Sequence, residues 1–437
     1  MKVILFLFYL IILSGSISAQ VSPETVAQLT LLNPNGYETI SQGKQYPVSW
    51  SFTGKFNSFN IDISKDGGIN WTNIVEDLPG DQYQYEWKTW KILSGNCRIR
   101  ISGISSQQEI IQDNSDFDFT IVWPNLFFDD FSYTDNSDSK IKKRGWEIVD
   151  RNTSPPCRES AYRKEMVSFE KDLDLPDNKL LVLSTYVNTD VGSIKFSRLE
   201  TNKHTMKIFN EGIYTARVMF DNKPAYYKDG NIETFYAINN RKCNDRKHSE
   251  CDFEYLPYDF WDNNGSKSAS LHLTSWEAYG CNGTESDRSA TDLTLFSDGW
   301  ELLKFEVLDG ENVKYFSGNK LLETHRNSNQ AHSVYPDSDM QIAFANWIWA
   351  KNSCEYQIGD SHDTRVAEFK IDFVLFLQKE FENNDDNEIN ATKIESIVKR
   401  LRDAGITYAN TLRGNSFISF NEDKKTELSN DVINFNQ

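Results

Sequence analysis

Short runs in which apolar and polar positions alternate fill the first part of the chain. Alternation over four to eight residues is the pattern of a half-buried β-strand, and glycine, proline, asparagine and aspartate between such runs mark turns. The runs are QLTLL, YPVSWSF, FNIDIS, YQYEW and CRIRISG, and the breaks are NPNG, KDGG and LPGD. Residues 21–123 are therefore predicted to form an all-β sandwich of about a hundred residues.

The same strand pattern continues through residues 126–379, after a hinge at VWPNLFFDDFSY. Helical periodicity is absent from this region, and a length of about 250 residues is compatible with one large β-sandwich. Its strongest runs are GIYTARVMF, IETFYAI, CDFEYL, SASLHLTSW, WELLKFEVL, MQIAFANWIW and FKIDFVLFL.

Residues 380–437 differ from both regions. ENNDDNEIN is a polar, acidic linker, and ATKIESIVKRLRDAG places apolar side chains on one helical stripe before a glycine stop. The stripe consists of Ile394, Ile397, Val398 and Leu401. We expect a short C-terminal helix that docks on its own chain.

Charge narrows the possible partners of the chain. Its 437 residues include 64 acidic and 46 basic side chains, for a formal net charge of −18. Nucleic acids and anionic membrane surfaces both need a basic face, so neither is expected as a partner. Residues 1–19 combine one lysine, an apolar stretch and small residues, which predicts a signal peptide and a secreted, extracellular protein.

In a secreted protein, the six cysteines can form disulfides and the five Asn-x-Ser/Thr triplets can carry glycans. Six cysteines allow about 15 complete disulfide pairings, which sequence does not distinguish. Cys97 is the only cysteine of the first region, so at least one thiol stays free if bridges form within domains. The triplets begin at Asn70, Asn152, Asn264, Asn282 and Asn390 and are candidate glycosylation sites.

Three acids stand on alternate positions in HSECDFEYLPYDFW, residues 248–261. In a strand, Glu250, Asp252 and Glu254 share one face, while Cys251 and its alternates point to the other. A solvated strand face is the ordinary interpretation of such a pattern. It is weakened here by the apolar opposite face, by nearby aromatic residues, and by the cost of placing like charges side by side.

Glycosidic bond cleavage is a reaction that uses such crowding. Retaining glycosidases need two carboxyl groups about 5–5.5 Å apart, one as nucleophile and one as general acid/base. Positions 250 and 254 are about 13 Å apart along a strand, and two glutamates that lean together can close that gap. Asp252 between them can hold one glutamate ionised and help to keep the other protonated.

ECDFE has the form Glu-x-Asp-x-Glu and resembles the signature of glycoside hydrolase family 16, which has a concanavalin A-like jelly-roll fold. LFFDDFSY, GIYTARVMF, DGWELLKFEVLDGENVKYFSGNKL and KIDFVLFLQ resemble other strands of that family in the same order, over residues 126–379. The first region is similar to an Ig-like domain of secreted microbial proteins and of yeast cell-wall β-glucan assembly proteins.

The resemblance implies Glu250 as nucleophile, Asp252 as its electrostatic assistant and Glu254 as general acid/base. It implies a secreted retaining endo-glycosidase, monomeric and without a cofactor, that acts on a β-1,3- or β-1,3-1,4-glucan. A wall-remodelling transglycosylase shares this chemistry, and a lectin that binds without cleavage is the alternative from another class.

Further residues are candidates for substrate binding, each with a core role as the alternative: His272, Trp276, Tyr255, Asn346 and Trp347. Sugar faces stack on aromatic rings, and polar side chains hold hydroxyls. Asp129, Asp130 and Asp372, at the first and last strands of the large region, offer hard oxygen ligands for a structural calcium ion, with a solvated acidic rim as the favoured alternative.

Overall fold

The computed structural model describes most of residues 26–412. Within that span, these residues are not described: 90–91, 153–159, 189–192, 205, 207, 222–230, 240–247, 258–268, 279–284, 293–298, 327–333, 337, 349–364, 380 and 382–388. The predicted signal peptide, Cys157, Cys243, Cys281 and Cys354 lie outside the described residues, as do Asn264 and Asn282.

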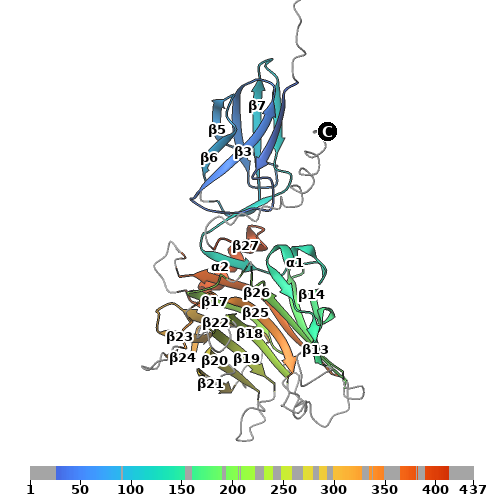
Figure 1. The fold of residues 1–437 in the computed structure, drawn as a ribbon, viewed down its shortest axis with the longest axis vertical. Helices are drawn as coiled ribbons and strands as arrows, with labels where there is room; N and C mark the ends of the chain where they lie inside the picture. The colour runs from blue at the N-terminus through green and yellow to red at the C-terminus, as the bar shows by residue number, and fades with distance from the viewer. Residues whose placement is uncertain are drawn as a thin grey trace, which may run out of the picture.

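The first region is a β-sandwich, drawn in blue at the top of Figure 1. One sheet is ordered β1 (Gln28–Asn33), β3 (Gln45–Thr53), β6 (Gln84–Lys88). The other is ordered β2 (Thr39–Ser41), β9 (Phe119–Val122), β7 (Ser94–Ser105), β4 (Phe56–Ser64), β5 (Thr72–Pro79), with β8 (Ile110–Asn114) also paired to β7. Trp50, Trp87 and Phe59 fill the core between them.

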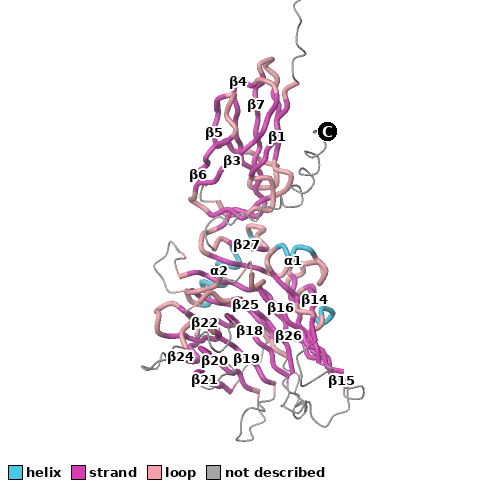
Figure 2. The backbone as a smooth tube through the Cα atoms, viewed as in Figure 1, coloured by secondary structure: helices cyan, strands magenta, loops and turns pink. Residues whose placement is uncertain are grey.

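The second region contains two further packed sheets (Figure 2). The sheet we call the acid-bearing sheet is ordered β11 (Trp146–Ile148), β16 (Ser193–Thr201), β25 (Gln341–Ile348), β18 (Asn231–Asn239), β19 (Ser249–Leu256), β20 (Ser270–Ala278), β21 (Glu285–Asp292).

The opposing sheet, which we call the helix-covered sheet, is ordered β14 (Val167–Lys171), β15 (Lys179–Asn188), β26 (Arg365–Gln378), β17 (Gly212–Met219), β22 (Glu301–Val307), β23 (Asn312–Ser317), β24 (Lys320–Arg326). The short strands β10 (Leu126–Asp129) and β27 (Tyr408–Asn410) extend it beside β26. Pairing of β15 with β16 joins the two sheets at one side, where β12 (Arg151–Asn152) and β13 (Ser160–Tyr162) are added.

Aromatic side chains fill the space between these two sheets. Phe235 stacks on Phe344 within the acid-bearing sheet at 5.1 Å between ring centroids, and Phe305 of the helix-covered sheet packs against Phe235 at 5.7 Å. All three rings are fully buried. This core gives the acid-bearing sheet a rigid support from behind.

Helix α2 (Ala391–Asp403) confirms the helical stripe predicted from the sequence. The Asn390 side chain accepts the Lys393 backbone N–H and so caps the helix start, which is a common role for asparagine. Ile394, Val398 and Leu401 pack on the outer face of the helix-covered sheet. The helix therefore docks on its own chain.

The end of α2 also contacts the first domain. The Gly95 backbone N–H donates to the Ala404 carbonyl at 2.8 Å, and a Cβ at position 95 would lie 2.4 Å from the Gly405 oxygen. Only glycine permits that approach. Arg400 lies over the Trp123 ring at 4.5 Å.

The expected fold class is confirmed: the described chain is all-β apart from α2, the short helix α1 (Ser139–Lys143) and a single 3₁₀ turn (Lys164–Met166). Among the described residues, no helix has the length and apolar character needed to cross a membrane.

Candidate active site

Strand β19 separates acids from core residues as the alternation predicts. Cys251 and Phe253 are fully buried in the core between the sheets. Glu250 and Glu254 on the other face are partly exposed, and Asp252 between them is 4% exposed. The two outer carboxylates therefore meet solvent on one face, around a buried middle one.

The pairing register places two predicted binding residues beside these acids. On the neighbouring strand β20, Trp276 is the partner of Glu250 and His272 is the partner of Glu254. Directly paired residues lie on the same face of a sheet, within about 5.5 Å at Cβ. The structure thus brings Glu250, Glu254, Trp276 and His272 together on the acid face.

The other neighbouring strands add residues to this face. Tyr236 of β18 is the partner of Asp252, and Ala343 of β25 is the partner of Tyr236. Trp347 of β25 also lies on the acid face, where its indole N–H donates to Thr234 Oγ1 at 3.2 Å. Tyr236, Ile238, Ala343 and Ala345 form an apolar cluster separate from the main core, with Trp347 packed against it.

Two of the predicted binding residues lie on the wrong face, and their assignment is corrected here. Tyr255 is 2% exposed and stacks on Phe220 in the core, with ring centroids 4.4 Å apart. Asn346 is fully buried, and its amide donates to the carbonyls of Leu183 and Ala367 in the opposing sheet. Both side chains point between the sheets because their positions alternate with those of the acid face.

Sequence reasoning missed a charged pair on the acid face. Arg198 and Glu200 of β16 are ion-paired, and they pair in register with Ala345 and Ala343 of β25. Arg198 also lies over the Tyr236 ring at 5.4 Å. The alternation in SIKFSRLET was the available signal, but only the strand order shows that these residues share a face with Glu254.

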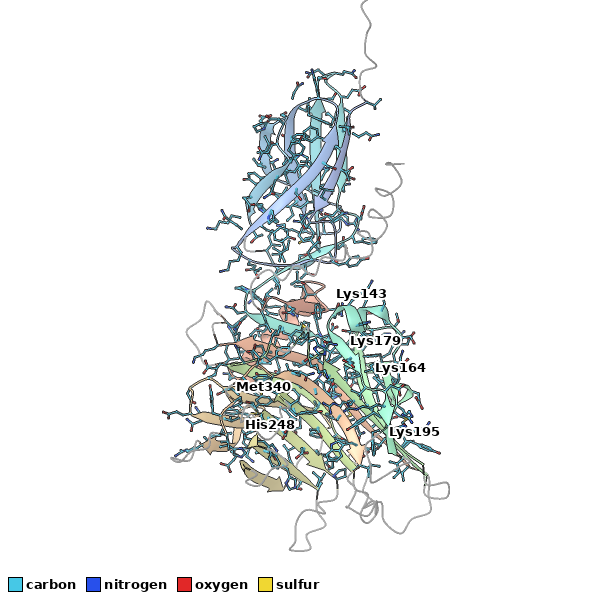
Figure 3. All side chains as sticks on the ribbon, viewed as in Figure 1. Lys143, Lys164, Lys179, Lys195, His248 and Met340 are labelled. Carbon is cyan, nitrogen blue, oxygen red and sulfur yellow. The ribbon has the colours of Figure 1, made fainter. Side chains whose placement is uncertain are left out.

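Sequence reasoning also missed His248, although it opens the stretch that contains the acids. Its Nε2 lies 2.8 Å from Glu250 Oε2, and the residue is only 5% exposed. In Figure 3, His248 lies within the lower domain, while the labelled lysines follow its right-hand edge. His248 is thus the direct side-chain neighbour of the first acid.

Two groups beside the acids, Cys251 and Tyr236, are held neutral by burial. Burial, and then the charge of Asp252, raise the pKa of the Cys251 thiol behind the strand. Burial raises the pKa of the Tyr236 phenol well above its ordinary value, although Arg198 opposes the shift. At neutral pH, both groups keep their protons, so neither adds negative charge to a strand that already carries three carboxyl groups.

Two of the three aspartates considered for calcium, Asp372 and Asp129, are occupied by protein hydrogen-bond donors. The Asp372 oxygens accept from Arg402 at 2.6 Å, Arg217 at 2.9 Å and Asn178 at 2.7 Å. Asp129 accepts from the Tyr133 hydroxyl and from the Trp146 indole at 2.8 Å. Calcium needs six or more free oxygen ligands, and within the described ranges no group of three acidic, histidine or cysteine side chains is placed to hold a metal.

Cys97 and Cys251 are both free and buried. The other four cysteines fall outside the described residues, so the expected disulfides stay a prediction for them.

Comparison with known proteins gives solved structures only. No family model matches the sequence, and no curated protein matches it. The structure is similar to a glycoside hydrolase family 16 endo-glucanase from Bacteroides ovatus, with 15% identity and a TM-score of 0.45 over 57% of this chain and 99% of that one.

Two further solved structures give similar values. A laminarinase from Flavobacterium has 16% identity and a TM-score of 0.40, over 56% of this chain and 97% of that one. The catalytic domain of an endo-1,3-β-glucanase from Thermotoga petrophila has 15% identity and a TM-score of 0.42, over 59% and 98%. At these values, the chemistry of this chain has to be inferred from its own site geometry.

Proposed function

We propose that this protein is a retaining endo-glycosidase that cleaves a β-linked polysaccharide. The supporting observation is the pair Glu250 and Glu254, partly exposed on one face of β19, with Trp276 and His272 beside them on β20. Two carboxyl groups that converge on one bond, next to an aromatic ring and a polar side chain, are what this reaction requires.

In the first step, Glu250 attacks the anomeric carbon and forms a glycosyl ester. Glu254 donates its proton to the glycosidic oxygen, which leaves with the aglycone part of the chain. Buried Asp252, between the two glutamates, has the role of electrostatic assistant to Glu250 in this proposal.

In the second step, the ester is hydrolysed. Glu254, now ionised, takes a proton from water, and the water oxygen bonds to the anomeric carbon as Glu250 leaves. Two displacements on the same carbon retain its configuration. Glu254 recovers its proton and Glu250 its charge, so the site returns to its starting state.

The proposed substrate class is a β-1,3- or mixed-linked β-glucan, following the sequence resemblance. The face offers an apolar cluster around Tyr236 and Trp347, next to the charged pair Arg198 and Glu200. Apolar surface suits the faces of sugar rings, and charged hydrogen-bonding groups suit their hydroxyls. An uncharged glucan is compatible with a face on which Arg198 is already neutralised by Glu200.

The test is incubation of the purified full chain with laminarin, lichenan, a mixed-linked glucan and a galactan, followed by analysis of the products by size. We expect oligosaccharides from at least one glucan, and near-complete loss of turnover in Glu250→Gln at unchanged thermal stability. Longer products would indicate transglycosylation. An oligosaccharide that binds and stays intact would identify a lectin and contradict the proposal.

A further inference from the structure

In the contact between His248 and Glu250, the donor and the acceptor can be assigned. Their separation of 2.8 Å is that of a strong hydrogen bond. An ionised carboxylate can only accept, so His248 Nε2 carries the proton and donates it to Oε2 of Glu250. The bond leaves the other carboxylate oxygen, Oε1, available to a substrate.

The chain around His248 holds the imidazole in place. His248 directly precedes β19, whose first residue, Ser249, pairs with Asn239 of β18. The Asn239 amide donates to Ser338 Oγ at 2.6 Å, and Ser249 Oγ lies 3.2 Å from the same atom. These hydrogen bonds hold the start of β19, and His248 is only 5% exposed. The imidazole is therefore a donor in a fixed position.

We propose that His248 is a positioning residue for the nucleophile Glu250. The inference rests on the proposed function, and it adds a role that the three-acid pattern does not contain. His248 fixes the rotation of the Glu250 carboxyl group, so that Oε2 is held and Oε1 faces the anomeric carbon. Such orientation lowers the activation barrier, because the carboxyl group has already lost its rotational freedom before the reaction begins.

The same hydrogen bond acts differently on the two steps. In the glycosyl ester, Oε1 is bonded to the sugar and Oε2 is a neutral carbonyl oxygen, so the bond from His248 is weak. As water bonds to the anomeric carbon and the Oε1–carbon bond breaks, negative charge returns to the carboxylate and the bond strengthens. His248 therefore assists departure of Glu250 in the second step more than its attack in the first.

This difference gives a readout that loss of structure does not produce. If the donor is removed, release of the ester slows more than its formation, and the glycosyl-enzyme accumulates. On an aryl β-glycoside with a good leaving group, a burst of phenol should precede slow turnover. A simple loss of stability would lower the total signal without creating a burst.

The experiment compares His248→Leu and His248→Gln with the unmodified full chain. Leucine removes the donor at similar volume, whereas the glutamine amide can still donate. We expect kcat of His248→Leu to fall about 10–100-fold, since misplacement of a reacting group costs up to about 100-fold. The apparent KM should fall with it, because slow release of an accumulating glycosyl ester lowers both constants. Intact-protein mass spectrometry should show the covalent adduct in His248→Leu, and His248→Gln should recover most of the rate.

His204→Leu is the matched control, because His204 is exposed in a loop and donates nothing to the acids. It should behave like the unmodified chain. Unchanged kcat and no adduct in His248→Leu, with an active parent protein, would overturn the inference and leave the proposed function intact. An inactive parent protein would overturn both. If His248→Leu does not fold, a His248→Gln variant with parental kcat supports the donor role, and one with a 100-fold loss contradicts it.

Discussion

The two faces of the larger domain place acidic side chains in different surroundings. Under helix α2, the fully buried Asp372 is neutralised by Arg402 of the helix and Arg217 of β17. On the acid face, Glu250, Asp252 and Glu254 crowd one strand, and Arg198, at the far side of the sheet, is paired with Glu200. The buried acid under the helix is held in two ion pairs, while the acid face carries three carboxyl groups on one strand.

This difference separates a structural role from a chemical one. A carboxylate held by two arginines stays ionised at neutral pH, and its burial keeps it from a substrate. Glu250 and Glu254 are instead partly exposed on the acid face, where a substrate can reach them. The following predictions test this division, beginning with the largest expected effect.

Glu254→Gln should reduce polysaccharide turnover about 100- to 10,000-fold, because general acid/base catalysis contributes that much. Its free energy of unfolding should change little, since the side chain is partly exposed. Aryl glycosides with good leaving groups need less acid assistance, so their first step should be largely preserved. Equal losses on both substrate types would argue against Glu254 as the acid.

Arg402→Met should lower the free energy of unfolding by about 3–5 kcal/mol, because it leaves the buried Asp372 short of a partner. Activity per folded molecule should be unchanged. Denaturant titration followed by activity at low denaturant tests both statements. Lys399→Met is the control, since its ion pair with Asp403 is exposed and contributes less than about 0.5 kcal/mol.

The ion pair between Asp372 and Arg402 predicts how the free energy of unfolding depends on pH. Burial alone raises the pKa of Asp372, but Arg402 and the hydrogen bonds from Arg217 and Asn178 bring the net shift below the ordinary value. A lowered folded-state pKa contributes stability that is present above the unfolded pKa of about 3.9 and is lost as the pH falls through the folded value. Acid unfolding curves should show this loss in the parent chain and a smaller one in Arg402→Met.

Asp130 should affect the pH dependence of the free energy of unfolding in the opposite direction. Burial, and then the neighbouring charge of Asp129, raise the pKa of Asp130 to about 7. Its cost to stability therefore appears as the pH rises from about 4 towards 7 and is complete above that. Asp130→Asn should gain about 4 kcal/mol at pH 8 and nothing at pH 4, by thermal or denaturant unfolding. An equal effect at both pH values would contradict a raised pKa.

Local pattern in the sequence was sufficient for the faces of single strands. The alternation at positions 250–254 predicted which side chains of β19 lie on the acid face, and the helical stripe predicted the buried side of α2. The alternation also placed Tyr255 on the face opposite the acids, which argued against a role for it in substrate binding. Tyr255 was misassigned because nearness in sequence was taken for nearness on a face.

Strand order could not be read from local pattern. Arg198 reaches the acid face only because β16, β25, β18 and β19 are neighbours in the sheet, across segments far apart in sequence. Arg402, one of the two arginines paired with Asp372, follows an acidic linker and lies on a different element. The hydrogen bond from His248 to Glu250 depends on side-chain rotation, which alternation does not specify.

The most direct measurement is identification of the residue that becomes covalently bound to the sugar. A 2-deoxy-2-fluoro glucosyl donor with a good leaving group slows the second displacement, so the ester persists through digestion and peptide mass spectrometry. The account predicts one adduct per chain, on Glu250 in the peptide that contains SECDFEYL. An adduct on Glu254 instead, or turnover with inversion at the anomeric carbon and no adduct, would contradict it.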